Sequence, residues 1–148
     1  MRVLPDTNIL LRIAKTDHPQ HAVADAAIEH LLSAAHSIHL VPQVLYEFWA
    51  VATRAESDNG LGHTTVEANA SIERLRSSFP VLEDRPGTLD LWQRLVRERD
   101  CKGKASHDTR LVAAMLGHGL THLLTFNVRH FARYDEIVAL SPNSLLQD

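Results

Sequence analysis

Short apolar runs alternate with longer helical patterns along this chain. This order predicts an α/β fold, a three-layer α/β/α sandwich with a central, mainly parallel sheet. Strands that are joined through helices need crossover connections, which make neighbouring strands parallel and place helices on both faces of the sheet. A chain of 148 residues can bury one core of its own, so we expect a single domain over residues 1–148.

Five short apolar runs have the composition and the bounding residues of strands. In chain order they are Arg2–Asp6, Ser37–Val41, Pro80–Leu82, His122–Thr125 and Ile137–Leu140. Pro5 cannot donate a backbone hydrogen bond to a neighbouring strand, so we expect it only where the first strand is ending.

Six helical patterns separate or follow these runs. In chain order they are Asn8–Ala14, Pro19–Ala35, Pro42–Thr53, Thr64–Ser78, Gly87–Arg99 and Ala105–Leu116. Proline suits the first turn of a helix, and Thr64-x-x-Glu67 is a capping-box pattern. Trp49 and Trp92 lie within two of these helices, and we expect both in the core.

The bulk composition excludes several classes of protein. A hydrophobic fraction of 45% with 22% charged residues is typical of an ordinary globular domain. The longest apolar run, Leu111–Leu116, is too short to cross a bilayer, so no membrane role is expected. Asp6 lies close to the start of the sequence and interrupts any long apolar segment there, so we expect no secretory signal peptide. Cys101 has no partner for an internal disulfide, which fits the reducing cytoplasm.

The charge distribution gives mixed indications about nucleic acid. A formal net charge of −3 argues against a broad nucleic-acid surface, which would usually be basic. The segment 94–110 nevertheless carries six basic and three acidic residues, so it can meet phosphates or form a solvated helix face. Arg54 and Arg110 are candidate phosphate contacts, although an arginine at the end of a helix also has a simple dipole rationale.

Four polar residues occupy positions where a charge is costly to bury. Asp6 ends the first strand, Glu47 interrupts the apolar stripe of its helix, Asp108 opens an apolar helix, and Asn127 follows the strand His122–Thr125. Ligands of parallel α/β sheets bind beyond the carboxyl ends of the strands. Carboxylates gathered there repel unless a cation holds them, and hard oxygen ligands select Mg²⁺ or Mn²⁺.

Each of these residues also has a purely structural explanation. Asp6 and Asp108 suit the first turn of a helix, where free N–H groups favour a negative charge. Glu47 fits a solvated helix edge, and Asn127 fits a turn. The four explanations are reasonable one by one, whereas a shared site explains all four positions together.

The ten histidines raise a zinc alternative. The pairs His18/His21 and His118/His122 have ligand-like spacing, but neither cysteine pairs nor an H-E-x-x-H motif accompany them. We therefore expect these histidines on the surface.

Four segments in order resemble the PIN-domain ribonucleases, in particular the VapC-like toxins of bacterial toxin–antitoxin pairs. The first is Val3–Leu11, which contains Asp6-Thr7-Asn8, and the second is Pro42–Trp49 followed by Ala52–Arg54 and Asn59–Gly62. The third and fourth are His107–Ala114 and Leu124–Phe131. The resemblance covers nearly the whole chain. Each segment alone is a weak signal, and the ordered set is a strong one.

This resemblance implies a Mg²⁺- or Mn²⁺-dependent endoribonuclease that hydrolyses RNA phosphodiester bonds. Asp6, Glu47 and Asp108 would be the metal-binding acids, with Asn127 as a fourth residue of the catalytic set. The hydroxyl and amide groups that would support them belong to Thr7, Asn8 and Thr125. The implied partners are RNA, a small antitoxin protein and a second copy of the chain, in the cytoplasm.

The chain departs from the family pattern at Asn127, where many PIN domains carry a fourth acid. An amide contributes no charge, so we expect one firmly bound cation rather than two. The departure and the net acidity also favour an alternative function, a PIN-fold binding module that is catalytically weak or inactive and acts through protein contacts.

Overall fold

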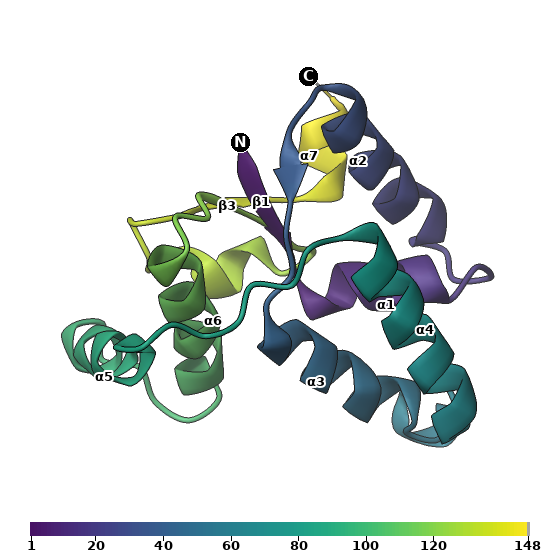
Figure 1. Ribbon diagram of the computed structural model, residues 1–148, viewed down its shortest axis with the longest axis horizontal. Helices are drawn as coiled ribbons and strands as arrows, with labels where there is room; N and C mark the ends of the chain where they lie inside the picture. Colours follow the sequence, from purple (N-terminus) through teal and green to yellow (C-terminus); the bar gives the residue numbers. More distant parts are fainter. Residues whose placement is uncertain (148) are drawn as a thin grey trace.

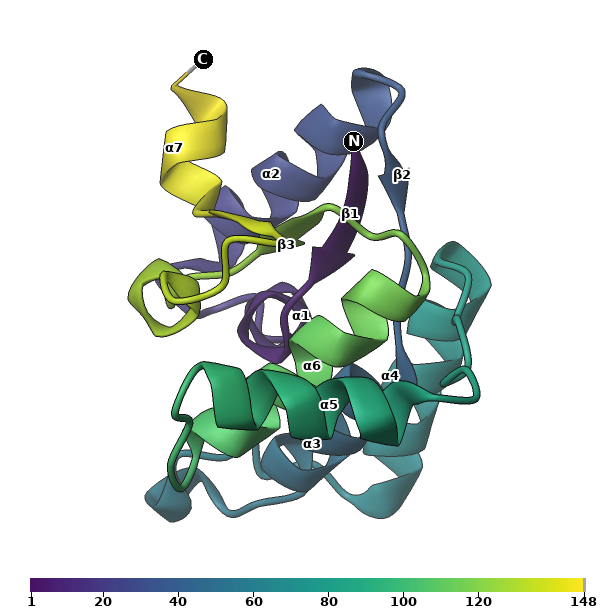
Figure 2. The same ribbon diagram turned by 90° about the vertical axis from the view of Figure 1, so that its left-hand side faces the viewer.

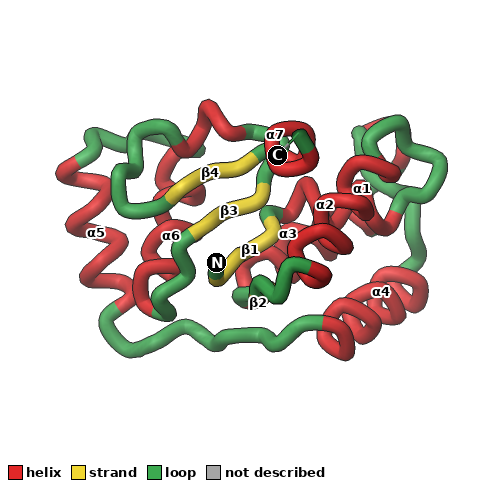
Figure 3. The backbone as a smooth tube through the Cα atoms, turned by 90° about the horizontal axis from the view of Figure 1, so that it is seen from above, coloured by secondary structure: helices red, strands yellow, loops and turns green. Residues whose placement is uncertain are grey.

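Four parallel strands form the centre of the molecule in the order β2-β1-β3-β4 (Figure 3). The structure, a computed structural model, describes residues 1–147, so Asp148 of the expected domain lies outside the described residues. The strands are β1 (Arg2–Pro5), β2 (Ser37–Ile38), β3 (His122–Leu124) and β4 (Val138–Leu140). The register pairs Val3 with Ile38 and with His122, and Leu124 with Leu140.

Helices connect and cover the strands (Figure 1). They are α1 (Thr7–Ala14), α2 (His21–Ser33), α3 (Pro42–Ala52), α4 (Thr65–Ser78), α5 (Thr88–Glu98), α6 (Ala105–Gly117) and α7 (Pro142–Leu146), with 3₁₀ turns η1 (Glu56–Asp58) and η2 (Val128–Phe131). Several start where the sequence places a cap. Asp6 caps α1, Pro42 opens α3, and both hydrogen bonds of the Thr64–Glu67 capping box are present at α4.

Each face of the sheet packs against its own group of helices, which confirms the expected three layers. Val3 and Leu124 belong to a core shared with α2 and α7. Their strand neighbours Leu4 and Leu123 point to the opposite face and join the larger core, which α3, α5 and α6 complete. Figure 2 shows α2 and α7 above the strands and α5 and α6 below them.

The structure differs from the expected elements mainly at their ends. Helix α2 begins at His21, because residues 18–20 form a turn in which His18 Nδ1 accepts the Gln20 N–H. The run Pro80–Leu82 forms a single parallel bridge, from Val81 to Leu40, rather than a strand. Helix α7 and the turn η2 were not expected, since both are too short to show a helical period.

Both tryptophans were expected in the core, and this prediction is wrong for Trp49. Trp49 is 36% exposed on α3, whereas Trp92 of α5 is partly buried against the larger core. The indole N–H of Trp92 donates to the Ser106 carbonyl at 2.8 Å, which gives its polar atom a partner. No helix within residues 1–147 is both long and apolar enough to span a membrane.

The carboxyl ends of β1 and β3 lie side by side and position the candidate site. Pro5 pairs with Leu124 at the last register position, and the Asp6 N–H donates to the Leu124 carbonyl at 2.9 Å. Backbone N–H groups alternate in direction along a strand, so Pro5 faces the side of β2, whose pairing has already ended at Ile38. Pro5 therefore costs the sheet little.

Candidate active site

Asp6 is a buried carboxylate at the junction of β1 and α1. Its Oδ1 accepts the Thr7 backbone N–H at 2.8 Å, and its Oδ2 accepts the Thr125 hydroxyl at 2.7 Å. Burial raises the pKa of Asp6, and the bonds from Thr125 and Thr7 lower it in part. The negative charges of Glu47 and Asp108 raise this pKa further, so the three acids lie within electrostatic range of one another.

Asn8 joins the start of α1 to the segment that follows β3. Its Nδ2 donates to Thr125 Oγ1 at 3.2 Å and to Asp6 Oδ2 at 3.3 Å, and its Oδ1 accepts the Phe126 N–H at 3.2 Å. Thr125 Oγ1 also accepts the backbone N–H of Asn127 at 3.0 Å. The expected supporting residues therefore hold the Asp6 carboxylate in one place.

Glu47 reaches the same region from α3. Thr7 Oγ1 donates to its Oε2 at 2.7 Å, and Gln43 Nε2 donates to its Oε1 at 2.9 Å. Gln43 precedes Glu47 by one helical turn, so the two side chains share a face of α3. Through its backbone N–H and its hydroxyl, Thr7 contacts the carboxylates of both Asp6 and Glu47.

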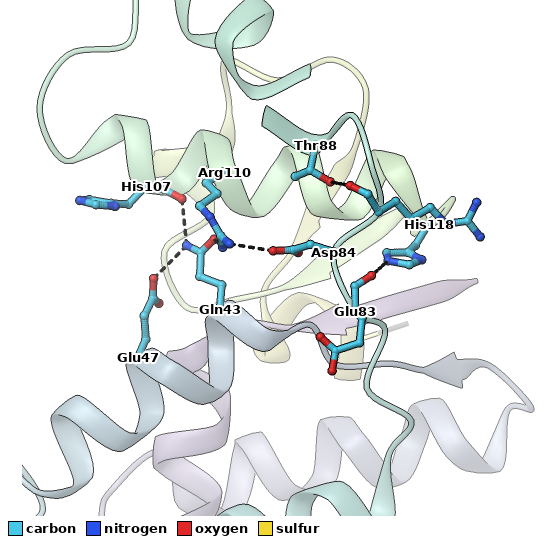
Figure 4. A network of polar contacts seen from close by, with 9 residues as sticks. Gln43, Glu47, Glu83, Asp84, Thr88, His107, Arg110 and His118 are labelled. Carbon is cyan, nitrogen blue, oxygen red and sulfur yellow. Dashed lines mark hydrogen bonds and ion pairs between the residues drawn. The ribbon is translucent and has the colours of Figure 1, made fainter. Parts of the chain in front are cut away.

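Gln43 is buried and uses its amide on three partners (Figure 4). Besides Glu47, its Nε2 donates to the His107 carbonyl at 3.0 Å, and its Oε1 accepts Arg110 Nη1 at 2.9 Å. Arg110 Nη2 in turn donates to Asp84 Oδ2 at 2.7 Å. Only one orientation of the amide satisfies two acceptors and one donor together. This network therefore fixes Gln43, and with it Glu47.

Asp108 lies in the first turn of α6 and is half-buried. Burial raises its pKa, the positive charge of His130 lowers it, and the negative charge of Glu47 raises it again. Arg133 also lowers this pKa. Among residues 1–147, no side chain or backbone group makes a hydrogen bond to the Asp108 carboxylate. Its oxygens are therefore free to bind a ligand.

The donor set of the site fits a hard cation. The side-chain oxygens here come from carboxylates, from the Thr7 and Thr125 hydroxyls and from the Asn8 amide, and oxygen ligands suit Mg²⁺ or Mn²⁺. Within residues 1–147 no three His, Cys, Asp or Glu side chains form a ready ligand cluster, for zinc or for any other metal. Mg²⁺ does not require one, because it keeps several waters and takes only one or two carboxylates.

Among the described residues, the side chains of the remaining expected residues make no hydrogen bond to Asp6, Glu47 or Asp108. Asn127 is exposed, and its side chain lines a separate hollow that also contains His130 and Ser141. Arg54 is exposed just after α3, and Arg110 is bound to Gln43 and an acid as described above. The roles given to Asn127, Arg54 and Arg110 from the sequence stay predictions.

Sequence reasoning missed Gln43 and Asp84, although Gln43 had a detectable signal. It lies four residues before Glu47 on an otherwise apolar helix, which places two polar side chains together. Asp84 lies in the irregular segment between α4 and α5, where no periodicity indicates a partner. His130 and Arg133, which lower the pKa of Asp108, lie in and just after the short turn η2, where no periodicity indicates a partner either.

A PIN domain family model matches residues 3–137, which is most of the chain. The chain belongs to the PIN domain family. It is 28% identical over 142 residues to Ribonuclease VapC31 of Mycobacterium tuberculosis, covering 94% of this chain and 97% of the relative. The resemblance to PIN-domain ribonucleases and VapC-like toxins seen in the sequence is thereby confirmed.

Solved structures of PIN proteins share the fold. VapBC2 from Rickettsia felis, bound to a DNA fragment from its promoter, aligns with a TM-score of 0.70 at 15% identity, covering 95% of this chain and 98% of that one. A toxin–antitoxin complex from Klebsiella pneumoniae aligns with a TM-score of 0.64 at 20% identity, covering 95% and 97%. At these identities the similarity establishes the architecture.

Proposed function

We propose that this PIN protein is a Mg²⁺- or Mn²⁺-dependent endoribonuclease and the toxin of a toxin–antitoxin pair. The observation that carries the proposal is the position of the acids. Asp6 and Glu47 are joined through Thr7 beyond the carboxyl ends of β1 and β3, and Asp108 is electrostatically coupled to both. The similarity to a ribonuclease over nearly the whole chain supports the same conclusion.

Each residue of the site has its own role in the proposed phosphodiester hydrolysis. Among Asp6, Glu47 and Asp108, one or two carboxylates would hold the cation directly and the rest through its waters. Thr7 and Thr125 keep the first two carboxylates in place. A bound Mg²⁺ or Mn²⁺ supplies Lewis-acid polarisation of a phosphoryl oxygen and lowers the pKa of a coordinated water. Water is then the nucleophile, so no side chain has to form a covalent intermediate.

A cleavage assay with matched variants tests the proposal. The purified protein should cut RNA with Mg²⁺ or Mn²⁺ and stop when EDTA is added. Asp6→Asn, Glu47→Gln and Asp108→Asn should each lower the rate by roughly 100-fold or more, the loss expected for a group that stabilises the transition state electrostatically. The control is Glu29→Gln, an exposed acid on α2, which should keep full activity.

The second candidate is a PIN-fold binding module without catalysis, which the lack of a ready three-ligand cluster within residues 1–147 favours. Equal RNA loss from the wild type and from Asp6→Asn would assign the cutting to a contaminant and support this candidate instead.

The toxin role is tested in cells. Expression of the protein in the bacterial cytoplasm should arrest growth. Either the Asp6→Asn substitution or co-expression of the product of the neighbouring reading frame should relieve the arrest. The antitoxin partner and a homodimer are part of the proposal, the former supported by the toxin–antitoxin complex that shares the fold. Growth arrest that neither change relieves would remove the toxin assignment while leaving the cleavage assay to judge the nuclease.

A further inference from the structure

A cavity of about 400 Å³ lies between α5 and α6, beside the Gln43 network. Its walls include Leu89 and Trp92 from α5, His107 and Arg110 from α6, and Asp84 from the loop before α5. None of the roles assigned to the acidic site uses Leu89 or Trp92, so the cavity calls for an explanation of its own.

The cavity is separated from Glu47 by one side chain. Arg110 and the His107 carbonyl both contact Gln43, and Gln43 contacts the Glu47 carboxylate (Figure 4). Asp108 directly follows His107 in α6. A ligand in the cavity would therefore lie next to the acids that we propose as the cleavage site.

One part of the cavity is apolar and open to solvent. Leu89 is 70% exposed in the first turn of α5, so its side chain adds little to the stability of the fold. Trp92 is held in place by the bond from its indole N–H to the Ser106 carbonyl. A fixed indole beside an exposed leucine offers apolar surface that a flat ring can cover.

Another part of the cavity carries charged groups in fixed positions. Arg110 is held between Gln43 Oε1 and Asp84 Oδ2, so a guanidinium and a carboxylate lie side by side. Such a pair offers both donors and acceptors to the edge of a ring. Unstacked RNA bases are recognised in this way, by stacking on aromatic side chains and by hydrogen bonds along their edges.

We propose that this cavity binds an unstacked nucleobase of single-stranded RNA, next to the phosphodiester that enters the acidic site. The inference rests on the proposed nuclease function, since it places the base relative to that site. It assigns Leu89, Trp92, Asp84 and Arg110 to substrate binding.

Tryptophan fluorescence reports directly on the cavity. The chain has two tryptophans, and Trp49→Phe leaves Trp92 as the only one. Short single-stranded RNA should quench Trp92 emission in this variant, whereas RNA of the same length without bases should not. The titration is done once in EDTA and once in Mg²⁺. In Mg²⁺ the fluorescence is read before the RNA has been cleaved to a significant extent.

A matched pair of leucine variants tests the apolar wall. In the same background, Leu89→Ala should raise the Kd for the RNA that quenches Trp92 by roughly tenfold, the loss expected when most of a leucine side chain no longer covers the ligand. Leu32→Ala is the control, because Leu32 is 51% exposed on α2, on the other side of the sheet. Alanine is a good helix former, so neither change should disturb its helix.

The outcomes separate this inference from the proposed function. RNA cleavage without quenching in either buffer, or equal quenching by RNA with and without bases, overturns the base-binding cavity and leaves the nuclease intact. An unchanged titration in Leu89→Ala also overturns it. If Trp92 emission changed with the protein concentration and not with the RNA concentration, the cavity would be assigned to binding of a second copy of the chain, which also overturns the inference. Quenching without cleavage supports the cavity and counts against the nuclease.

Discussion

Burial of the ionised Asp6 carboxylate costs free energy that its hydrogen bonds offset only in part. Its pKa is raised by burial and by the negative charges of Glu47 and Asp108, beyond what the bonds from Thr125 and Thr7 offset. A carboxyl whose pKa is raised in the folded state contributes its full stabilisation of the fold at pH values below the ordinary pKa of aspartate. This contribution is lost as the pH rises through the folded-state pKa, so in the absence of metal an ionised Asp6 destabilises the protein at neutral pH.

Asp6→Asn should therefore make the metal-free protein more stable at pH 7 while removing its cleavage activity. Asparagine caps a helix about as well as aspartate, so α1 keeps its start. We expect the melting temperature in EDTA to rise by roughly 2–4 °C, corresponding to about 1 kcal/mol. The gain should shrink as the pH falls from the raised pKa of Asp6 towards the ordinary value, and it should be absent below that value. A lower melting temperature at pH 7 would contradict this account.

Gln43 also acts at the scale of single residues, as a positioning residue for Glu47. Gln43→Met keeps the approximate volume but leaves the groups that it contacts without a partner. We expect kcat for RNA to fall by about 10- to 100-fold with little change in KM, the usual effect of losing a group that orients a metal ligand. Gln93→Met, at an exposed position of α5, should change neither constant. A change confined to KM would argue for substrate contact instead.

Among the elements, α4 supports the fold without supplying any residue to the candidate site. Its capping box satisfies backbone N–H groups that the helix itself leaves free, through the Thr64 hydroxyl and the Glu67 carboxylate. By contrast, α1, α3 and α6 each begin near the edge of the sheet where the acids gather. Stability and function are therefore separable at the level of whole helices.

Thr64→Ala should lower the free energy of unfolding by about 1 kcal/mol, as measured by urea denaturation, because the cap is lost. RNA cleavage under native conditions should not change. Thr65→Ala replaces the next threonine, which is exposed, and is expected to be nearly neutral in stability. If Thr64→Ala reduced cleavage while the protein remained folded, α4 would have a role in the site that its position does not indicate.

At the scale of the whole molecule, a bound cation should stabilise the folded state. Its proposed ligands are Asp6 at the junction of β1 and α1, Glu47 in α3 and Asp108 in α6, which come together only after folding. The gain follows the ratio of free metal to Kd and reaches about 2.7 kcal/mol at a hundredfold excess over Kd. Melting curves with increasing Mg²⁺ or Mn²⁺ should show it in the wild type. Asp6→Asn and Asp108→Asn should each abolish most of the shift, and an equal shift in the Asp6→Asn variant would place the cation elsewhere.

Much of the fold could be predicted because its signals are local. The Thr64–Glu67 box, the proline at the start of α3 and the apolar strands β1 and β3 all depend on residues close in sequence. The prediction failed where pairing depends on distant partners. Val81 makes one bridge to Leu40 and no strand, because nothing in its own neighbourhood determines how far that pairing extends.

Part of the candidate site could also be predicted from the sequence. Asp6, Glu47 and Asp108 each appeared as a charge in an apolar setting, and a parallel sheet brings the ends of its strands to one edge. Their contacts did not appear, since Thr7 meets Glu47 across 40 positions and Thr125 meets Asp6 across 119. The exposure of Trp49 was likewise missed, because a helical period does not reveal which neighbour covers a given face.

The sequence alone determined the chain order of most strands and helices and singled out Asp6, Glu47 and Asp108 as candidate acids, because hydrophobic period, caps and turn residues act within a few positions. Only the tertiary structure decided that Gln43 donates to Glu47 while Arg110 donates to Gln43, and that a cavity opens beside them. Those features arise where α3, α5 and α6 pack together. Such contacts depend on the relative placement of distant segments, for which no local pattern exists.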